Sequence, residues 1–84
     1  MKKVIFTHHA EDAIRERKID RQWIIRTPFE PEWSESDPDR SGIERRFRAI
    51  PEFEDRVLRV ACYETDAELR IVTVFFDRRA RKQR

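Results

Sequence analysis

Residues 69–77 read Leu-Arg-Ile-Val-Thr-Val-Phe-Phe-Asp, and the chain continues at once with Arg-Arg-Ala-Arg-Lys-Gln-Arg at 78–84. The first part is rich in β-branched and aromatic residues and contains neither Gly nor Pro, which predicts a β-strand. Its alternating faces are both largely apolar: one carries Leu69, Ile71, Thr73 and Phe75, and the other carries Val72, Val74 and Phe76. We expect such a strand to be buried on both sides and central in its sheet.

The segments just before this strand predict its partners. Residues 56–63 have a second strand pattern, and the polar stretch 64–67 turns the chain so that 69–77 pairs back antiparallel. Residues 43–50 form another strand, which Pro51 closes. A weaker strand is expected at 30–34, and Asp-Pro-Asp-Arg-Ser-Gly at 37–42 predicts the turn that follows it.

The N-terminal part predicts one strand and two helices. Residues 3–6 form the strand, and Thr7 caps a helix from His8 to about Lys18. Asp20 caps a second helix over 21–27, which we expect to end at Pro28, since the residue before a proline disfavours the helical region. The order β-α-α-β-β-β-β predicts an α+β fold, with both helices on one face of an antiparallel sheet.

Length and composition limit the class of protein. The 84 residues fit a single domain over 1–84, and the one cysteine, Cys62, excludes an internal disulfide framework. No apolar run approaches the length of a membrane span, and the N-terminus does not fit a secretory signal, so we expect a cytoplasmic protein without membrane contact. Because the sequence has no glycine-rich phosphate loop, paired-cysteine motif or His-Glu-x-x-His, we expect neither a cofactor nor a metal.

Charge is unevenly distributed along the chain. The net charge is +2, but residues 1–68 hold 13 Lys/Arg against 16 Asp/Glu, whereas residues 69–84 hold six against one. The acids include a block at 30–39 that contains no base. The basic tail at 78–84 suggests a phosphate-bearing or acidic partner, and the alternative is a solvated tail without function.

Several short motifs resemble a known family. They are Phe-Thr-His-His-Ala at 6–10, Arg-Glu-Arg-Lys-Ile at 15–19, Pro28, Val-Leu-Arg-Val at 57–60 and Ile-Val-Thr-Val-Phe-Phe-Asp at 71–77. Together they are similar to the bacterial domain of unknown function 4258, which is grouped with the RelE/ParE-like toxin superfamily. Family members often carry an Arg three residues after the motif's alanine, where this chain has Ala13.

The resemblance implies a RelE/ParE-like fold and the toxin of a bacterial type II toxin–antitoxin system. Such a toxin would be a metal-independent RNA endonuclease that acts on mRNA, with RNA and a cognate antitoxin protein as its partners. Two alternatives stay open: a gyrase-directed ParE-like toxin, and a non-catalytic module of the same fold that binds nucleic acid or protein. Whether the chain is an enzyme, and its oligomeric state, are therefore undecided by the sequence.

Three residues are candidates for catalysis. His9 has a side chain that can serve as base or acid when a 2′-hydroxyl attacks a phosphate, and its alternative role is structural. Arg59 lies mid-strand among apolar residues; on an open sheet face it would stabilise phosphorane charge, and otherwise it would pair with Glu44 or Asp77. Thr73 would hydrogen-bond a phosphate or Arg59, unless it is an ordinary buried threonine.

A second set of residues is a candidate phosphate-binding rim. The predicted nucleic-acid-binding cations are Arg46, Arg48, Arg78, Arg79, Arg81 and Lys82. The aromatic residues Trp33, Phe47 and Tyr63 are available for base stacking. The alternative for Arg46 and Arg48 is cross-strand pairing with Glu30, Glu32 or Glu35. We expect Trp23 and Cys62 to be core residues.

Overall fold

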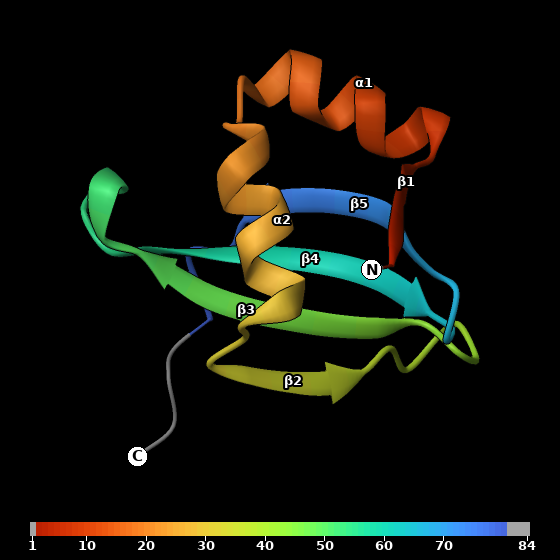
Figure 1. The fold of residues 1–84 in the computed structure, drawn as a ribbon. Helices are drawn as coiled ribbons and strands as arrows, with labels where there is room; N and C mark the ends of the chain where they lie inside the picture. Colours follow the sequence, from red (N-terminus) through yellow and green to blue (C-terminus); the bar gives the residue numbers. More distant parts are fainter. Residues whose placement is uncertain (1, 81–84) are drawn as a thin grey trace.

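The strand predicted at residues 69–77 lies next to one edge of a five-stranded sheet. A computed structural model describes residues 2–80, in which β5 (Glu68–Phe76) pairs with β1 (Lys3–Phe6) and β4 (Arg56–Glu64). The sheet continues through β3 (Glu44–Ile50) to β2 (Trp33–Ser36), so the order is β1-β5-β4-β3-β2 (Figure 1). β1 runs parallel to β5 and the other pairs are antiparallel. The α+β prediction is confirmed, but β4 rather than β5 is the central strand.

Two helices, α1 (His8–Arg17) and α2 (Arg21–Phe29), cover one face of this sheet (Figure 1). Both predicted caps are confirmed: Thr7 Oγ1 accepts the Ala10 N–H at 3.1 Å, and Asp20 Oδ1 accepts the Gln22 N–H at 2.8 Å. The predicted end of α2 at Pro28 is wrong, because the helix includes Pro28 and continues to Phe29. A proline so close to the end costs little, since the Glu30 N–H still reaches the Arg26 carbonyl at 2.9 Å.

The strand expected at 30–34 is displaced toward the C-terminus. β2 begins at Trp33, which lies opposite Phe47, and it ends at Ser36. The residues before it cannot extend the ladder fully because Pro31 has no N–H group to donate. After β3 the chain forms a single turn of 3₁₀ helix, η1 (Pro51–Phe53), before it enters β4.

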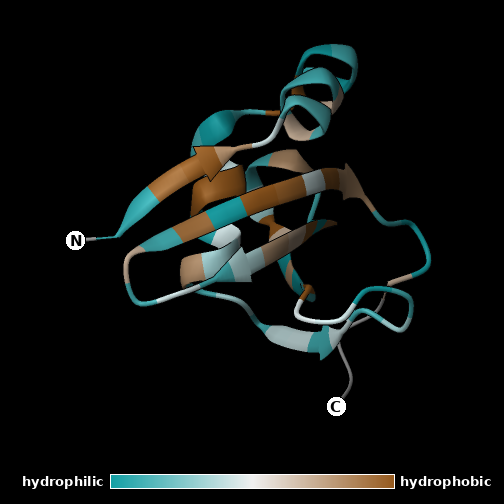
Figure 2. Ribbon diagram, turned by 90° about the vertical axis from the view of Figure 1, so that its right-hand side faces the viewer, coloured by the Kyte–Doolittle hydropathy of each residue, from teal (hydrophilic) through white to brown (hydrophobic). Residues whose placement is uncertain are grey.

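The hydrophobic core lies between the helices and the covered face of the sheet. Ala10, Ala13, Ile14 and Ile24 contribute from the helices, and the strands contribute Leu58, Val60, Cys62, Leu69, Ile71 and Val74. In Figure 2 most of α1 is hydrophilic, while β5 is largely hydrophobic apart from its N-terminal end. Trp23 packs at the margin of this core with Phe53 and Phe76, as expected from the sequence.

A β-bulge in β5 decides which side chains face the helices. Ala61 pairs with Thr73 but the next residue, Cys62, pairs with Ile71, so Val72 is left without a partner on β4. Leu69 and Ile71 therefore share the covered face with Val74 and Phe76. The predicted division of β5 into two strictly alternating faces is wrong beyond the bulge, and Thr73 and Phe75 lie on the other face.

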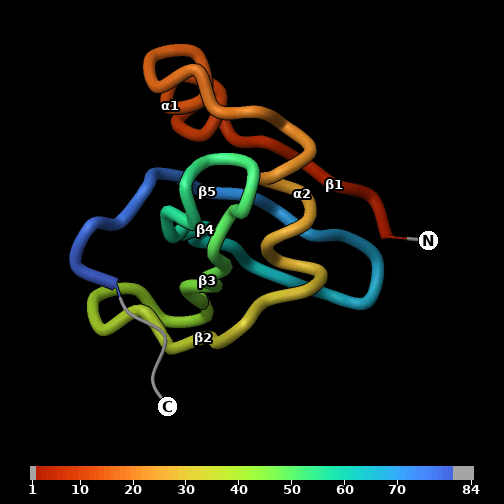
Figure 3. The backbone as a smooth tube through the Cα atoms, turned by 90° about the vertical axis from the view of Figure 1, so that its left-hand side faces the viewer, coloured from red at the N-terminus to blue at the C-terminus, as the bar shows by residue number. Residues whose placement is uncertain are grey.

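That second face, called the open face below, carries no helix within residues 2–80. Figure 3 views the sheet with α2 on one side and the segment that follows β5 on the other. Neither helix in the described chain has the length and apolar character that crossing a membrane requires.

Candidate nucleic-acid interface

Four side chains form a row across the open face, and we name them the aromatic–arginine row: Trp33, Phe47, Arg59 and Phe75. They occupy directly opposed positions on β2, β3, β4 and β5. The rings of Trp33 and Phe47 stack with centroids 4.8 Å apart and an angle of 3° between their planes. Arg59 holds its guanidinium carbon 4.7 Å from the centroid of the Phe75 ring, which is a cation–π contact.

Arg59 is only partly neutralised by its surroundings. Its Nη1 donates to Asp77 Oδ2 at 3.2 Å, and the side chain is 21% exposed. Its Nε is buried and has no hydrogen-bond partner among residues 2–80. Since a guanidinium has five N–H donors, the pair with Asp77 leaves donors available for a further acceptor. Arg59 thus faces the open side and also pairs with Asp77, two placements that were alternatives from the sequence, and stabilisation of phosphorane charge stays a prediction.

Asp77 anchors Arg59 and also turns the chain away from β5. Its Oδ1 accepts the backbone N–H groups of Arg79 at 2.9 Å and Ala80 at 3.1 Å. Burial favours a higher pKa for Asp77, but the hydrogen bonds from Arg79, Arg59 and Ala80 outweigh it, so the pKa lies below its ordinary value. The carboxylate is therefore ionised at neutral pH and holds the arginine in position.

Thr73 lies in the neighbouring row of the open face. It is opposite Ala61, which is opposite Arg45, and Arg45 is in turn opposite Glu35. The Arg45 guanidinium lies 3.8 Å from the Glu35 carboxylate and 3.5 Å from that of Asp37, so its charge is compensated within this row. The structure therefore places Arg59 and Thr73 on one face in adjacent rows.

His9 is separated from these two residues. It is exposed on α1, and α1 packs through Ala10, Ala13 and Ile14 on the covered face of the sheet. The three predicted catalytic residues thus do not form one constellation: Arg59 and Thr73 share the open face, and His9 belongs to the helical layer.

Arg46 and Arg48 lie on the covered face, apart from the aromatic–arginine row. Arg46 donates to Glu44 at 2.7 Å, to Glu64 at 2.6 Å and to the Pro28 carbonyl at 2.9 Å. Burial favours a lower pKa for Arg46, but its hydrogen bonds to the two glutamates outweigh it and raise the pKa above its ordinary value. Arg48 donates to the Glu30 carbonyl at 2.7 Å. Even-numbered positions of β3 face α2, so these arginines fasten the end of that helix to the sheet.

The remaining predicted cations follow β5. Arg78 and Arg79 are exposed in the turn after the strand, and neither has an ion-pair partner within the described chain. Arg81 and Lys82 lie outside the described residues. Of the six predicted nucleic-acid-binding cations, Arg78 and Arg79 have neither an ion pair nor a side-chain hydrogen bond within residues 2–80, whereas Arg48 has no ion pair there but donates to the Glu30 carbonyl.

Phe75 is the member of the site that sequence reasoning missed, because strict alternation placed it in the core. The bulge that moves it to the open face leaves no mark in the sequence. The cysteine prediction is confirmed: Cys62 is 1% exposed, and burial raises its thiol pKa to about 11. No group of three metal-ligating side chains occurs within residues 2–80.

The open face thus offers the half-buried rings of Trp33 and Phe75 with Arg59 against Phe75, while Phe47, stacked on Trp33, is buried. Tyr63 adds an exposed ring, 43% accessible, beside Gly42. Aromatic rings and guanidinium groups stack on nucleobases, and guanidinium donors bind phosphate oxygens. The predicted base His9 does not lie on this face, so among residues 2–80 the geometry fits binding more directly than proton transfer.

Comparison with known proteins identifies a family. The protein family described as "Domain of unknown function (DUF4258)" matches residues 6–76, which include both helices and nearly all of the sheet. No curated protein and no solved structure matches the chain.

Proposed function

The chain belongs to the DUF4258 family, and from this premise we propose that it is a toxin of the RelE/ParE-like kind that acts on RNA as a metal-independent endonuclease. In this proposal the open face of the sheet holds single-stranded RNA, and a cognate antitoxin covers that face when the toxin is inactive. The toxin assignment is supported by the sequence resemblance. The choice of RNA is supported by the open face.

The aromatic–arginine row is the observation that carries the proposal. Bases that are not paired in a duplex can stack on Trp33 and on the Arg59–Phe75 pair, and such stacking is tolerant of sequence. The free donors of Arg59 point to a phosphate acceptor, and they would favour a transition state in which phosphate charge grows. Arg78 and Arg79 add unpaired positive charge where the chain leaves β5.

A second candidate is an RNA-binding module that does not cleave. One observation favours it: His9 lies in the helical layer and not with Arg59 and Thr73. RNA cleavage needs a base and an acid near the scissile phosphate, whereas binding needs only the stacking surfaces and the cation.

The binding site is tested with an Arg59→Gln variant. We expect its affinity for a fluorescently labelled single-stranded RNA to fall roughly tenfold, since one charge-assisted contact of about 1.5 kcal/mol is lost. The matched control is Arg15→Gln, which removes an exposed cation from α1, and it should bind as the unmodified protein does. Anisotropy titrations at fixed salt measure both, and circular dichroism checks the fold. Equal affinity for the two variants would exclude the row as the RNA site.

Cleavage is tested separately by incubating the RNA with the protein in EDTA and resolving the products on a denaturing gel. Fragments ending in a 2′,3′-cyclic phosphate are expected from the endonuclease. Binding with intact RNA supports the second candidate. If induced expression in bacteria gives an SOS response without loss of mRNA, the toxin is directed at gyrase instead.

A further inference from the structure

A cleft lies where α1, α2, η1 and the end of β5 meet, and it shares Phe75 with the aromatic–arginine row. It has a volume of 520 Å³, and it adjoins a second cavity of 320 Å³ with which it shares Arg56, Phe76 and Arg78. The cleft lies at the C-terminal end of β5, where Phe75 and Phe76 pair with Arg59 and Leu58 of β4.

The charged lining of this cleft is entirely basic. The four cations are Arg17, Lys18, Arg56 and Arg78, and none of the described lining residues is acidic. Arg17, Lys18 and Arg78 have no ion-pair partner within residues 2–80. Arg56 lies 3.7 Å from the exposed carboxylate of Glu54, a weak surface pair that an anionic ligand can replace.

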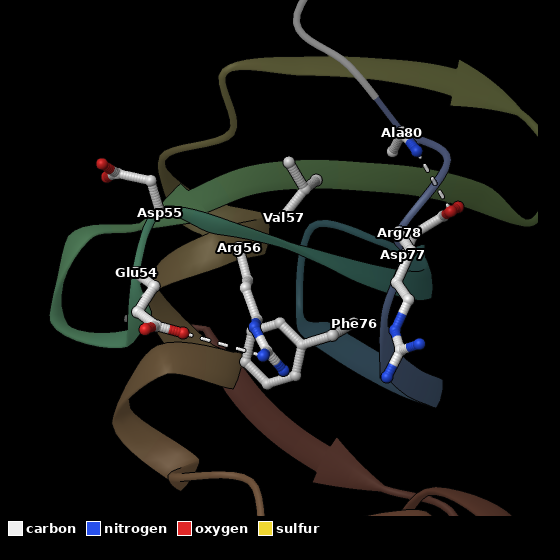
Figure 4. A pocket seen from close by; sticks show the side chains of 8 residues that line it. All are labelled: Glu54, Asp55, Arg56, Val57, Phe76, Asp77, Arg78 and Ala80. Carbon is white, nitrogen blue, oxygen red and sulfur yellow. Dashed lines mark hydrogen bonds and ion pairs between the residues drawn. The ribbon is translucent and has the colours of Figure 1, made fainter.

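The remaining lining is aromatic. Trp23 and Phe53 stack with centroids 5.8 Å apart, Phe76 contacts both rings, and Phe75 completes the wall. Arg56 lies 4.7 Å from the centroid of Phe53. Figure 4 shows the adjoining 320 Å³ cavity, in which the side chains of Arg56 and Arg78 extend to the same side as the Phe76 ring and the Glu54 carboxylate faces Arg56, while Asp55 points away and Asp77 turns toward Ala80.

We propose that this cleft binds a nucleotide, with the phosphate held by Arg17, Lys18, Arg56 and Arg78 and the base placed against the aromatic wall. Clusters of unpaired arginine and lysine bind phosphate, and aromatic rings bind bases by stacking. Sites for small ligands have volumes of about 300–1,000 Å³, a range that includes this cleft.

The nucleotide can be a free mononucleotide or the phosphorylated end of an RNA strand. Phe75 favours the strand end geometrically, because it belongs both to the row and to the cleft wall. An RNA lying on the open face would then place its terminal nucleotide in the cleft. This second source rests on the proposed function, whereas binding of a free nucleotide does not.

Lys18 offers a variant that keeps the fold intact. Lys18 is the C-cap residue of α1, and its backbone is in the left-handed region with φ of 54°, which glycine adopts with the least strain. Lys18→Gly therefore removes a cleft cation while the midpoint of unfolding should stay unchanged or rise. If the role of Lys18 were purely structural, Lys18→Gly would weaken nucleotide binding only together with a loss of stability.

Trp23 supplies the readout. The chain has two tryptophans and one tyrosine, so in a Trp33→Phe background, with excitation above the tyrosine absorption band, the emission comes from Trp23, which lies in the cleft wall. We expect AMP, GMP, CMP or UMP to quench its fluorescence saturably, with inorganic phosphate and the matched nucleosides each binding roughly tenfold more weakly.

In this background Lys18→Gly and the double variant Arg17→Gln/Arg78→Gln should each weaken binding roughly tenfold. The control double variant Lys3→Gln/Arg15→Gln removes the same charge elsewhere and should have no effect.

The source is decided with a short single-stranded RNA made with and without a terminal phosphate. Tighter binding of the phosphorylated RNA that is lost in Lys18→Gly assigns the cleft to the strand end, while indifference to that phosphate together with mononucleotide quenching assigns it to a free nucleotide. Absence of saturable quenching at millimolar nucleotide, with no effect of the terminal phosphate, overturns the proposal. RNA binding that still depends on Arg59 would then leave the proposed function standing.

Discussion

At the scale of single residues, two arginines in neighbouring strands differ in how many of their N–H donors have acceptors within the fold. Arg46 is 14% exposed at its side chain and has three acceptors from different parts of the chain. Arg59 has one carboxylate partner, one aromatic ring and a buried Nε without an acceptor. The Arg46 donors are satisfied within the fold, whereas the partly exposed Arg59 guanidinium has a single carboxylate partner within residues 2–80, so we expect Arg46 to contribute to stability and, in our proposal, Arg59 to contact RNA.

Arg46→Gln tests this division. The change removes charge-assisted hydrogen bonds to Glu44, Glu64 and the Pro28 carbonyl, so we expect the free energy of unfolding to fall by about 2 kcal/mol. Urea denaturation followed by circular dichroism measures it. RNA affinity at a temperature where the variant is folded should equal that of the unmodified protein. If RNA affinity falls while stability is unchanged, the two arginines have been assigned the wrong way round.

At the scale of elements, Thr7 joins the start of α1 to the bulge of β5. Its Oγ1 accepts the Ala10 N–H and donates to the Val72 carbonyl, both at 3.1 Å. Val72 is the bulged residue, so one hydroxyl fastens the helix to the irregularity that turns Thr73 and Phe75 to the open face.

We therefore expect Thr7→Ala to cost about 1–2 kcal/mol of stability, since a helix cap and a hydrogen bond are lost together. Thr7→Ser keeps the hydroxyl and should recover most of this loss. Urea midpoints at constant slope compare the three proteins. Equal destabilisation by both substitutions would show that the methyl group, and not the hydroxyl, matters.

A second link between elements depends on pH. Arg26 of α2 donates to both carboxylate oxygens of Glu52 in η1, at 3.1 and 2.8 Å, and the hydrogen bonds from Arg26 lower the pKa of Glu52 from 4.5 to about 2. Because the folded pKa is depressed, the stabilisation is complete above about pH 4.5 and is lost as the pH falls toward 2.

Glu52→Gln should thus lower the thermal midpoint at pH 7 by a small amount, as befits an exposed pair, and the difference from the unmodified protein should shrink toward pH 2. Thermal scans across this pH range measure the convergence. A difference that persists unchanged at the acid end would mean that the variant acts through something other than the charge of Glu52.

At the scale of the whole molecule, the residues that form the core and the residues that carry the excess positive charge lie in different parts of the chain. The core is formed by residues between Ala10 and Val74, while the positive excess lies after Phe76. Deleting residues 81–84 removes Arg81, Lys82 and Arg84. We expect unchanged unfolding but weaker RNA binding, and the slope of log affinity against log salt should become shallower by about 2 if all three contact phosphates.

Anisotropy titrations at several salt concentrations measure that slope. The Arg59→Gln variant is the comparison, because it should weaken binding while changing the slope by less than one. An identical slope in the truncated and full-length proteins would show that these cations do not contact RNA.

Local pattern was enough to predict the elements and their order in this protein. Caps at Thr7 and Asp20, β-branched runs and the polar turn at 64–67 act over a few residues, so the sequence alone specified two helices, the strands and an α+β fold. The face assignment of Arg46, Arg59 and Phe75 depended on the tertiary structure. The face of the sheet on which each side chain lies is set by the strand register and by the unpaired residue in β5. Both depend on cross-strand hydrogen bonds between segments distant in sequence. The stretch 69–77 therefore predicted its own strand, but only the folded sheet decided that Val74 and Phe76 face the core while Thr73 and Phe75 lie on the open face.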